Sequence, residues 1–240
     1  MIGPPGTDLE WMALHVAALF VHDENGRLLR PNQPSEEQLP PRFFLGRTAH
    51  GNLWRFAAGL AHERIIELAR LAGAERSSRA LVEGPERLEP IRRCLERDAP
   101  IETTYHGPAF RFPELSALPE PGDTVISITP DRAELLERHF PKFLPAAPDG
   151  VPYFGAIEDG AAVAICHSAT GPGPAVEAGV ETAPGWRRRG LGARVVVSWA
   201  RAVSAAGRLP LYSTWWGNAG SRGLARRLEL IPFGADLHFR

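Results

Sequence analysis

Apolar residues recur at helical spacing near the start of the chain and then give way to short strand-like runs. The helical spacing predicts a helix from about 8 to 20, which begins at the capping box Thr7-Asp8-Leu9-Glu10. Two further helices are expected over 60–71 and 86–97. Asn25-Gly26 predicts a hairpin of 19–23 with 27–30, and His50-Gly51-Asn52 predicts one of 42–48 with 53–56. One more strand is expected over 103–112, interrupted by Gly107-Pro108. This first region is therefore expected to be α+β.

Prolines and a glycine gather between two apolar runs near the middle of the chain. Pro113, Pro119, Pro121 and Gly122 make 113–122 the best candidate for a domain boundary. A length of 240 residues allows either one large domain or two small ones. We therefore expect a smaller α+β region over 1–115 and a second domain over 116–240.

The second region is expected to combine strands and helices, and the protein as a whole is expected to be a two-part α/β protein. Thr129 and Pro130 begin a helix that is expected to run to about residue 140. Asp159-Gly160 joins the two strands of a hairpin. The expected strands are 124–128, 152–157, 161–169, 176–182, 209–215 and 233–239, and helices are expected to begin near 191 and 218.

Two glycines and three consecutive arginines stand between a predicted strand and a predicted helix. Pro184 and Gly185 end the strand, and Gly190 and Gly192 let the backbone turn and approach a ligand with no side chain in the way. The helix that follows points its first N–H groups and its positive dipole end at this loop. The arginines at 187–189 add charge-assisted hydrogen bonds of roughly 1.5 to 3 kcal/mol each. We interpret the loop as phosphate-binding.

Other interpretations of this stretch stay open from the residues alone. Val195-Val196-Val197 is β-branched and suits a buried strand as well as a helix. The three arginines are also compatible with a basic surface turn or a contact to nucleic acid. The formal net charge of −1 and a pI near 6.7 provide no overall basic field for nucleic acid or an anionic membrane, so an anion site must be local.

The glycine-arginine loop and the sequence after it resemble the GNAT superfamily of acyl-CoA-dependent N-acetyltransferases. Arg187, Gly190 and Gly192 match the pattern R-x-x-G-x-G after a strand and before a helix. A strand, the segment 218–228 and a closing strand then follow in the family's order. The resemblance covers roughly residues 120–240 and implies a mixed central sheet with flanking helices. It also implies acetyl-CoA as the co-substrate.

Carried over residue by residue, the resemblance assigns three parts of a coenzyme A site. Backbone amides of the loop would hold the pyrophosphate, with the arginines reaching its oxygens. The end of the preceding strand would pair with pantetheine as an added strand, and Asn218 and Ser221 would line the arm from the other side. The implied cofactor-binding residues are Val180, Glu181, Thr182, Arg187, Arg188, Arg189, Gly190, Leu191, Gly192, Ala193, Asn218 and Ser221.

The sequence departs from the family pattern at two positions. Many members have a tyrosine that protonates the departing thiolate where this chain has Ala225. Glu229 replaces a glycine that is usual near the end of the same helix. Ser221 and Tyr212 are the candidates to supply the missing proton.

Acetyl transfer to an amine also needs a group that removes a proton from the amine. An amine with a pKa of ~10.4 is mostly protonated at pH 7, and freeing it costs about 4.6 kcal/mol. Glu177 and Glu181 share one face of the predicted strand because they are four residues apart. Glu177 lies further from the phosphate loop and is therefore the predicted catalytic base, with a solvated strand residue as the alternative. We expect direct attack in a ternary complex, since no activated nucleophile stands out.

Other chemistries and locations are disfavoured by the residue pattern. The histidines show no metal-ligand spacing, so no metal is expected. Cys166 and His167 are neighbours on a strand and face opposite ways. The glycine and serine spacing at 220–223 is one residue short of a hydrolase elbow. Two cysteines and the absence of a leader or membrane-span pattern lead us to expect a cytoplasmic protein.

Three functions are compatible with these residues. The first is acetyl transfer from acetyl-CoA to the amine of a small molecule or peptide that the sequence does not identify. The second is an inactive acyl-CoA-binding regulatory module, and the third is RNA binding through the arginine loop. We expect neither nucleic acid nor membrane as a partner and leave a homodimer open. A cover over the acceptor site is one role for residues 1–115.

Overall fold

A computed structural model describes residues 5–33, 38–146 and 151–240 of the chain, and these cluster into two compact units. Unit 1 comprises Phe112–Tyr212 and Gly220–Ile231. Unit 2 comprises residues 5–111 together with Ser213–Ala219 and Pro232–Arg240. The chain thus leaves unit 2 after Arg111, close to the predicted boundary, and later returns to it.

This grouping differs from a contiguous division at residue 115, because two late segments cluster with the amino-terminal region. Strand β11 (Ile231–Phe239) pairs antiparallel with β3 (Phe43–Thr48), in a register from Ala235↔Arg47 to Phe239↔Phe43. The closing strand, which is expected in the second domain, therefore completes the sheet of unit 2. Local sequence patterns carry no information about such a pairing, since the two strands lie at opposite ends of the chain.

Unit 2 confirms the helices and hairpins that the sequence predicts for the first region. Its strands lie in the order β4-β3-β11-β5. Strands β1 and β2 form a separate antiparallel pair. The elements are α1 (Asp8–Leu19), β1 (Phe20–His22), β2 (Leu28–Pro31), β3, β4 (Gly51–Phe56), α2 (His62–Gly73), α3 (Leu88–Glu96) and β5 (Thr104–Arg111).

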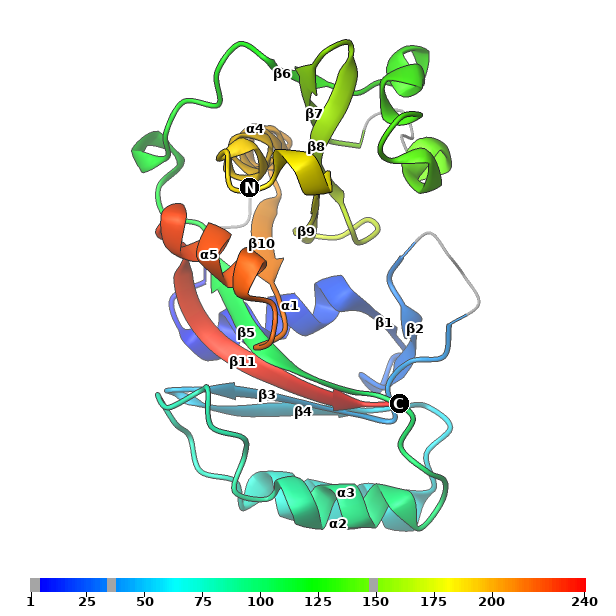
Figure 1. Ribbon diagram of the computed structural model, residues 1–240. Helices are drawn as coiled ribbons and strands as arrows, with labels where there is room; N and C mark the ends of the chain where they lie inside the picture. The colour runs from blue at the N-terminus through cyan, green and yellow to red at the C-terminus, as the bar shows by residue number, and fades with distance from the viewer. Residues whose placement is uncertain (1–4, 34–37, 147–150) are drawn as a thin grey trace. The chain divides into compact units, whose positions relative to one another are not determined.

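The helices of unit 2 cover both faces of its sheet (Figure 1). Alternation along β3 sends Phe43 and Leu45 to the face where α2 and α3 pack. On the other face the Met12 side chain of α1 lies over Gly46 and Gly234, where a Cβ would meet its thioether within 2.5 Å. Glycine is therefore required at these two positions for α1 to approach the strands.

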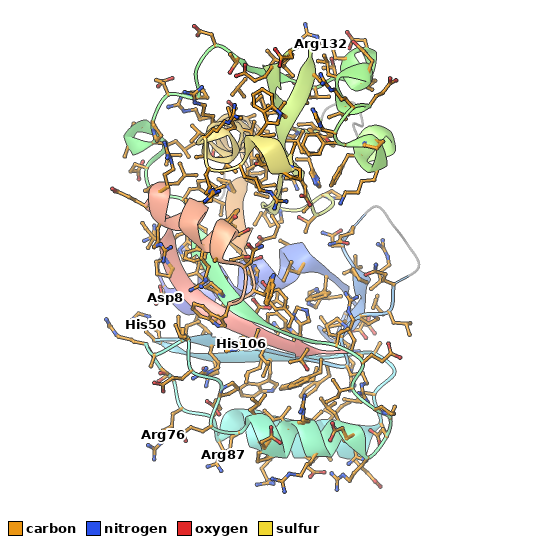
Figure 2. All side chains as sticks on the ribbon, in the orientation of Figure 1. Asp8, His50, Arg76, Arg87, His106 and Arg132 are labelled. Atoms are coloured by element: carbon orange, nitrogen blue, oxygen red, sulfur yellow. The ribbon has the colours of Figure 1, made fainter. Side chains whose placement is uncertain are left out.

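The start of α1 is fixed by the predicted capping box. The Glu10 backbone N–H donates to Thr7 Oγ1 (3.3 Å), and the Thr7 backbone N–H donates to Glu10 Oε2 (3.0 Å). Asp8 in the first turn also faces His50 in the β3–β4 turn, with 3.0 Å between Asp8 Oδ2 and His50 Nδ1 (Figure 2). The first turn of α1 is therefore held by the Thr7–Glu10 capping box and by the contact of Asp8 with His50.

A fully buried carboxylate joins α1 to β11 in unit 2. Asp236 is 0% exposed, and its two oxygens lie 3.2 Å from His15 Nε2 and 3.1 Å from His238 Nδ1. Burial alone would raise the pKa of Asp236, but the hydrogen bonds from the two histidines outweigh it and lower the pKa to about 2. Tyr105 stacks on His238 with ring centroids 4.7 Å apart. The network therefore stabilises unit 2 while Asp236 is ionised.

Unit 1 holds a mixed sheet with helices beside it, as expected. Its strands lie in the order β10-β9-β8-β7-β6, with β10 parallel to β9 and the other pairs antiparallel. Helix α4 packs against β7, β8 and β9. The elements are β6 (Val125–Ser127), β7 (Tyr153–Glu158), β8 (Ala161–Ser168), β9 (Ala175–Thr182), α4 (Leu191–Ala205), β10 (Leu209–Ser213) and α5 (Ala219–Arg227).

The predicted helix over 129–140 is a 3-10 turn instead. It spans Pro130–Leu136, and Arg132 has φ −119° and ψ 15°, which breaks the helical path. A second 3-10 turn follows at Pro141–Ala146. Figure 1 shows these turns on one side of β7 and β8 and α4 on the other. The sheet of unit 1 is thus covered by a long helix on one face and by short turns on the opposite face.

The strand predicted over 209–215 ends at Ser213. Beyond it, within unit 2, the Thr214 N–H donates to Pro108 O (3.2 Å) and the Trp216 N–H to His106 O (3.1 Å). Gly107 lies between these contacts, and a Cβ there would collide with the Thr214 backbone. Gly107 therefore permits a close backbone approach and does not interrupt β5, contrary to the expected break. In the part of the chain that the structure describes, no helix is long and apolar enough to cross a bilayer.

Replacing Asp236 by asparagine tests the buried network. D236N leaves the buried His15 and the partly buried His238 facing an uncharged amide, so we expect a loss of about 3–5 kcal/mol in the free energy of unfolding at pH 7. The ionised carboxylate stabilises the fold above the unfolded pKa of ~3.9, and this contribution of about 2 kcal/mol is lost as pH falls toward the folded value.

Urea denaturation of wild type, D236N and D98N from pH 3 to 7 measures both effects. Asp98 pairs with Arg64 at the surface and serves as the matched control, for which we expect a much smaller change. Equal stability of D236N and wild type at pH 7 would contradict the account of the network.

Candidate functional site

Strands β9 and β10 run side by side for only three residue pairs and then part. The register runs from Ala175↔Leu209 to Glu177↔Leu211. On its other edge β9 stays paired with β8 as far as Thr182↔Ala164. The five residues 178–182 are half-buried, whereas 175–177 are buried. The edge of β9 that faces away from β8 therefore carries backbone N–H and C=O groups beyond the register with β10.

The chain turns sharply between β9 and α4. A short 3-10 turn, Pro184–Trp186, leads to extended backbone at Arg187 (φ −66°, ψ 157°). Arg188 and Gly190 then take left-handed conformations, with φ of +63° and +81°. Gly190 is the N-cap residue of α4 and supplies no side-chain cap to the helix. The first N–H groups of α4 therefore face the loop, as predicted.

Both glycines of the loop lie against neighbouring elements. A Cβ on Gly190 would lie 3.1 Å from Arg227 Nη2 of α5. A Cβ on Gly192 would lie 3.3 Å from both Thr182 Oγ1 and Leu224 Cδ1. The start of α4 thus meets the end of β9 and one face of α5, and larger residues at these positions would push the three elements apart.

The arginines of the loop have separate surroundings. Arg187 Nε donates to Thr182 O (3.2 Å), so its guanidinium is turned back to the end of β9. The Arg189 guanidinium carbon lies 4.7 Å above the centre of the Trp186 ring. Arg188 is exposed. Glu181, the acidic residue near the end of β9, pairs with Lys142 at 3.8 Å. Unit 1 therefore presents a concentration of positive charge where β9 ends and α4 begins.

The predicted catalytic residues of unit 1 gather where the two strands part. Glu177 is 3% exposed and occupies the last pair of the register. Tyr212 follows Leu211 in β10 and donates from its hydroxyl to Ser221 O (3.4 Å). Burial raises the pKa of Tyr212 to about 12, and the nearby charge of Glu177 adds to the effect. Tyr212 therefore holds its proton at neutral pH and can act as a hydrogen-bond donor.

The other predicted cofactor residues divide between the two units. Val180, Thr182 and Ser221 belong to unit 1 with the loop, and Leu191 and Ala193 are buried in the first turn of α4. Asn218 belongs to unit 2, where its backbone N–H donates to Trp215 O (3.0 Å). The structure thus brings the loop, the end of β9 and Ser221 together within one unit, and it describes Asn218 in the other.

Sequence reasoning missed two residues beside the strand edge, Gly179 and His167. They are paired across β9 and β8, and the imidazole lies so close that a Cβ on Gly179 would be 2.5 Å from its Nε2. A glycine inside a strand pattern signals such a close approach and could have drawn attention to this position. The sequence pattern singles out His167 only as the neighbour of Cys166, which is fully buried with its thiol pKa raised by desolvation.

Residues 5–33, 38–146 and 151–240 contain no group of three histidine, cysteine, aspartate or glutamate side chains arranged to hold a metal ion.

Comparison with known proteins gives likenesses in structure but not in sequence. No family model matches the chain, and no curated protein matches it. Many of the similar solved structures are GNAT-family acetyltransferases.

Three of these structures illustrate the range. A putative GNAT acetyltransferase from Novosphingobium aromaticivorans is 19% identical with a TM-score of 0.47, over 58% of this chain and 65% of its own, which is less than two thirds of its length. A GNAT-family acetyltransferase from Colwellia psychrerythraea is 10% identical with a TM-score of 0.48, over 78% and 75%. The aminoglycoside N-acetyltransferase AAC(6')-Iy in complex with CoA is 18% identical with a TM-score of 0.37, over 43% and 88%.

The left-handed conformation of Arg188 gives a prediction about stability. A residue with a Cβ at φ +63° is strained, so R188G is expected to raise the free energy of unfolding by up to about 1 kcal/mol. R188A keeps the Cβ and is expected to bring no gain. R187G is the matched control, because Arg187 is extended and glycine there only adds freedom to the unfolded chain.

Thermal unfolding of the three variants at one pH and salt concentration measures these differences. The conformation assigned to the loop is wrong if R188G and R187G lose stability equally.

Proposed function

We propose that the protein binds acetyl-CoA along the free edge of β9 and transfers its acetyl group to an amine. One observation carries this proposal: β9 and β10 part after Glu177, and residues 178–182 of β9 separate this point from the glycine-arginine loop. An extended ligand with a phosphate group at one end finds, in this order, a positive loop, a strand edge and a buried carboxylate. Few ligands other than an acyl-CoA combine these features.

The loop would hold the pyrophosphate through backbone and guanidinium groups. Gly190 and the uncapped first turn of α4 offer N–H donors and the positive end of the helix dipole. Arg188 and Arg189 are exposed and can reach phosphate oxygens, and Arg227 lies beside Gly190. Arg187 would act indirectly. Its Nε donates a hydrogen bond to Thr182 O, and this contact holds the first residue after the 3-10 turn against the end of β9.

The pantetheine arm would lie along residues 178–182 as an added strand. Amide and carbonyl groups of the arm can pair with the free edge of β9, in the way that peptides add to exposed sheet edges. Val180, Glu181 and Thr182 are the predicted contacts on this edge. The arm then ends beside Glu177, where β10 closes the space, so the thioester would stop at this point.

Acetyl transfer would proceed by direct attack of the amine on the thioester carbonyl. A backbone N–H of the β9 edge would stabilise the oxyanion. Tyr212 is a candidate donor to the leaving sulfur if its hydroxyl turns away from Ser221 O, to which it donates in this structure, and the Ser221 hydroxyl is the second candidate. Glu177 is the base that the sequence favours, and its place at the end of the register agrees with an acetyl group nearby.

A second candidate function is binding of acyl-CoA without turnover. Ala225 lies where family members have the tyrosine that protonates the thiolate, and it is 1% exposed. Tyr212 keeps its proton because burial raises its pKa to about 12. An inactive binding module would keep the loop and the strand edge but release no thiol.

Thermal stabilisation by cofactor derivatives tests the cofactor. Acetyl-CoA at 100 times its Kd is expected to stabilise the protein by about 2.7 kcal/mol. The triple variant R187Q/R188Q/R189Q is expected to lose most of this shift, and R132Q, which removes an exposed arginine at the far end of unit 1, is expected to retain it (Figure 2). Dephospho-CoA in the same experiment reports whether an arginine contacts the 3′-phosphate. No shift with any CoA derivative would overturn the proposal.

Thiol release across a panel of polyamines, aminoglycosides, amino acids and peptide N-termini tests turnover. We expect one class of amine to release CoA, and E177Q to lower kcat about 10²-fold or more while leaving the thermal shift by acetyl-CoA unchanged. Binding of acetyl-CoA with no release from any amine would favour the inactive module. RNA affinity that falls steeply with salt, together with indifference to CoA, would favour the RNA-binding alternative.

A further inference from the structure

His167 lies on β8 directly opposite Gly179, at the point where β9 has lost β10 as a neighbour. The two residues are partners in the β8–β9 register, one pair on from Ser168↔Ala178. Because Gly179 has no side chain, the edge of the imidazole occupies the space beside its Cα. Its Nε2 and Cε1 are the atoms nearest to the position that a Cβ on Gly179 would take, at 2.5 and 2.6 Å. The imidazole edge therefore lies over the same backbone along which the thioester would rest.

The orientation of the ring is set by its other nitrogen. His167 Nδ1 lies 3.3 Å from the carbonyl oxygen of Ser168, which can only accept a hydrogen bond. In the neutral ring Nδ1 therefore carries the proton and Nε2 carries the lone pair. The nitrogen that can accept a proton is thus the one that faces β9.

The surroundings of His167 favour the neutral ring. Phe143 and Tyr153 pack against it, with ring centroids at 5.1 and 5.6 Å. Burial lowers the pKa of His167 below its usual value and outweighs the hydrogen bond to Ser168 O, which acts to raise it. Glu181 also acts to raise this pKa and Lys142 to lower it. These two residues pair with each other at 3.8 Å, so their effects largely offset. The Tyr153 hydroxyl is buried, and burial also raises its pKa.

We infer that His167 is a catalytic residue that accepts, through Nε2, the proton lost by the acceptor amine. This inference rests on the proposed function and deepens it by naming the group on the acceptor side. Neighbouring strands are ~4.8 Å apart, so a thioester along the free edge of β9 would lie about one strand spacing from an imidazole above Gly179. An amine that approaches the thioester from this face of the sheet would come close to the imidazole.

The proton balance of the step is complete. The amine nitrogen attacks the thioester carbonyl carbon, and a C–N bond forms while the C–S bond breaks. The nitrogen's proton moves to His167 Nε2, which gives the imidazolium, and the electron pair of the C–S bond leaves with sulfur. The imidazolium then loses its proton to water or to the CoA thiolate, so that the products are the amide and CoA thiol.

Glu177 is less well placed for direct contact with the amine. It lies on the same face of β9 as Gly179, but in the last pair with β10, and it is 3% exposed. Its charge acts on Tyr212, the residue after its register partner Leu211, so Glu177 lies beside the candidate donor to the sulfur. The two residues therefore occupy different positions. In the proposed complex His167 would lie beside the amine, and Glu177 would lie where β9 and β10 are last paired.

A comparison of H167Q, G179A and H139Q tests this inference. Glutamine removes the titration but keeps a polar side chain, and G179A keeps the histidine while its Cβ displaces the ring. His139 belongs to the same unit and packs on Phe140, so H139Q is the matched control. Acetyl-CoA is the probe throughout, and thermal shift confirms in each variant that it still binds.

Two readouts report on His167. With an accepted amine, we expect H167Q to lower kcat about 10²-fold or more and to remove the fall in kcat below the imidazole pKa. In wild type the imidazole 13Cε1 resonance that H167Q lacks should titrate below pH 6.5 and should shift on addition of acetyl-CoA. G179A should give an intermediate loss of kcat, and H139Q none.

The outcomes separate this inference from the proposed function. Failure of wild type to bind acetyl-CoA overturns both. If acetyl-CoA binds and H167Q retains the wild-type kcat and pH profile, the inference is wrong and the proposed function stands. If no amine is turned over, an imidazole resonance that acetyl-CoA leaves unmoved also overturns the inference, whereas a shifted resonance supports it. Loss of the acidic limb in E177Q rather than H167Q would assign the base to Glu177.

Discussion

Backbone N–H and C=O groups need hydrogen-bond partners. In unit 1, one edge of β9 carries such groups beyond its last pair with β10. Strand β9 runs five residues beyond its last pair with β10 while β8 continues to pair with its other edge. Sheet edges of this kind are covered, charged or used to bind an extended partner. The arginine loop with its glycines lies at one end of this edge, and the buried carboxylate of Glu177 lies at the other. The proposed function uses them together for this reason.

The loop at one end of the edge shows how charge and backbone geometry act together. Gly190 can adopt a left-handed conformation at little cost, but Arg188 adopts one as well and is strained. Strain at a residue that the fold alone does not require is typical of a binding site. Arg187 meanwhile contributes to shape, since its guanidinium is bonded to the strand it follows. The three arginines thus have different surroundings despite being adjacent.

Local features of the fold are predictable from the sequence, and pairings between distant segments are not. The capping box at Thr7, the turns at Asn25-Gly26 and Asp159-Gly160, and the start of α4 after Gly190 all depend on neighbouring residues. The helix predicted over 129–140 is wrong because prolines at both ends and the kink at Arg132 favour 3-10 turns. The pairing of β11 with β3 depends on tertiary contacts that no spacing reveals.

The candidate site divides in the same way. Sequence spacing predicts a phosphate-binding loop at 187–193 and places Glu177 and Glu181 on one strand. It does not show that β10 leaves β9 directly after Glu177, because this depends on where two strands separated by α4 stop pairing. It also does not bring His167 to Gly179, since the β8–β9 register fixes this contact. Roles for Glu177, Ser221 and Tyr212 stay predictions.

The central claim is that the edge of β9 at 178–182 receives the arm of acetyl-CoA. Amide hydrogen exchange, with and without saturating acetyl-CoA, measures this residue by residue. We predict slower exchange for amides within 178–182 and 187–193. Residues 164–167 of β8 are already paired with a strand on each edge, and their amides should change little. Exchange that is unchanged at 178–182 while acetyl-CoA is bound would contradict the account, because the ligand would then occupy another part of the molecule.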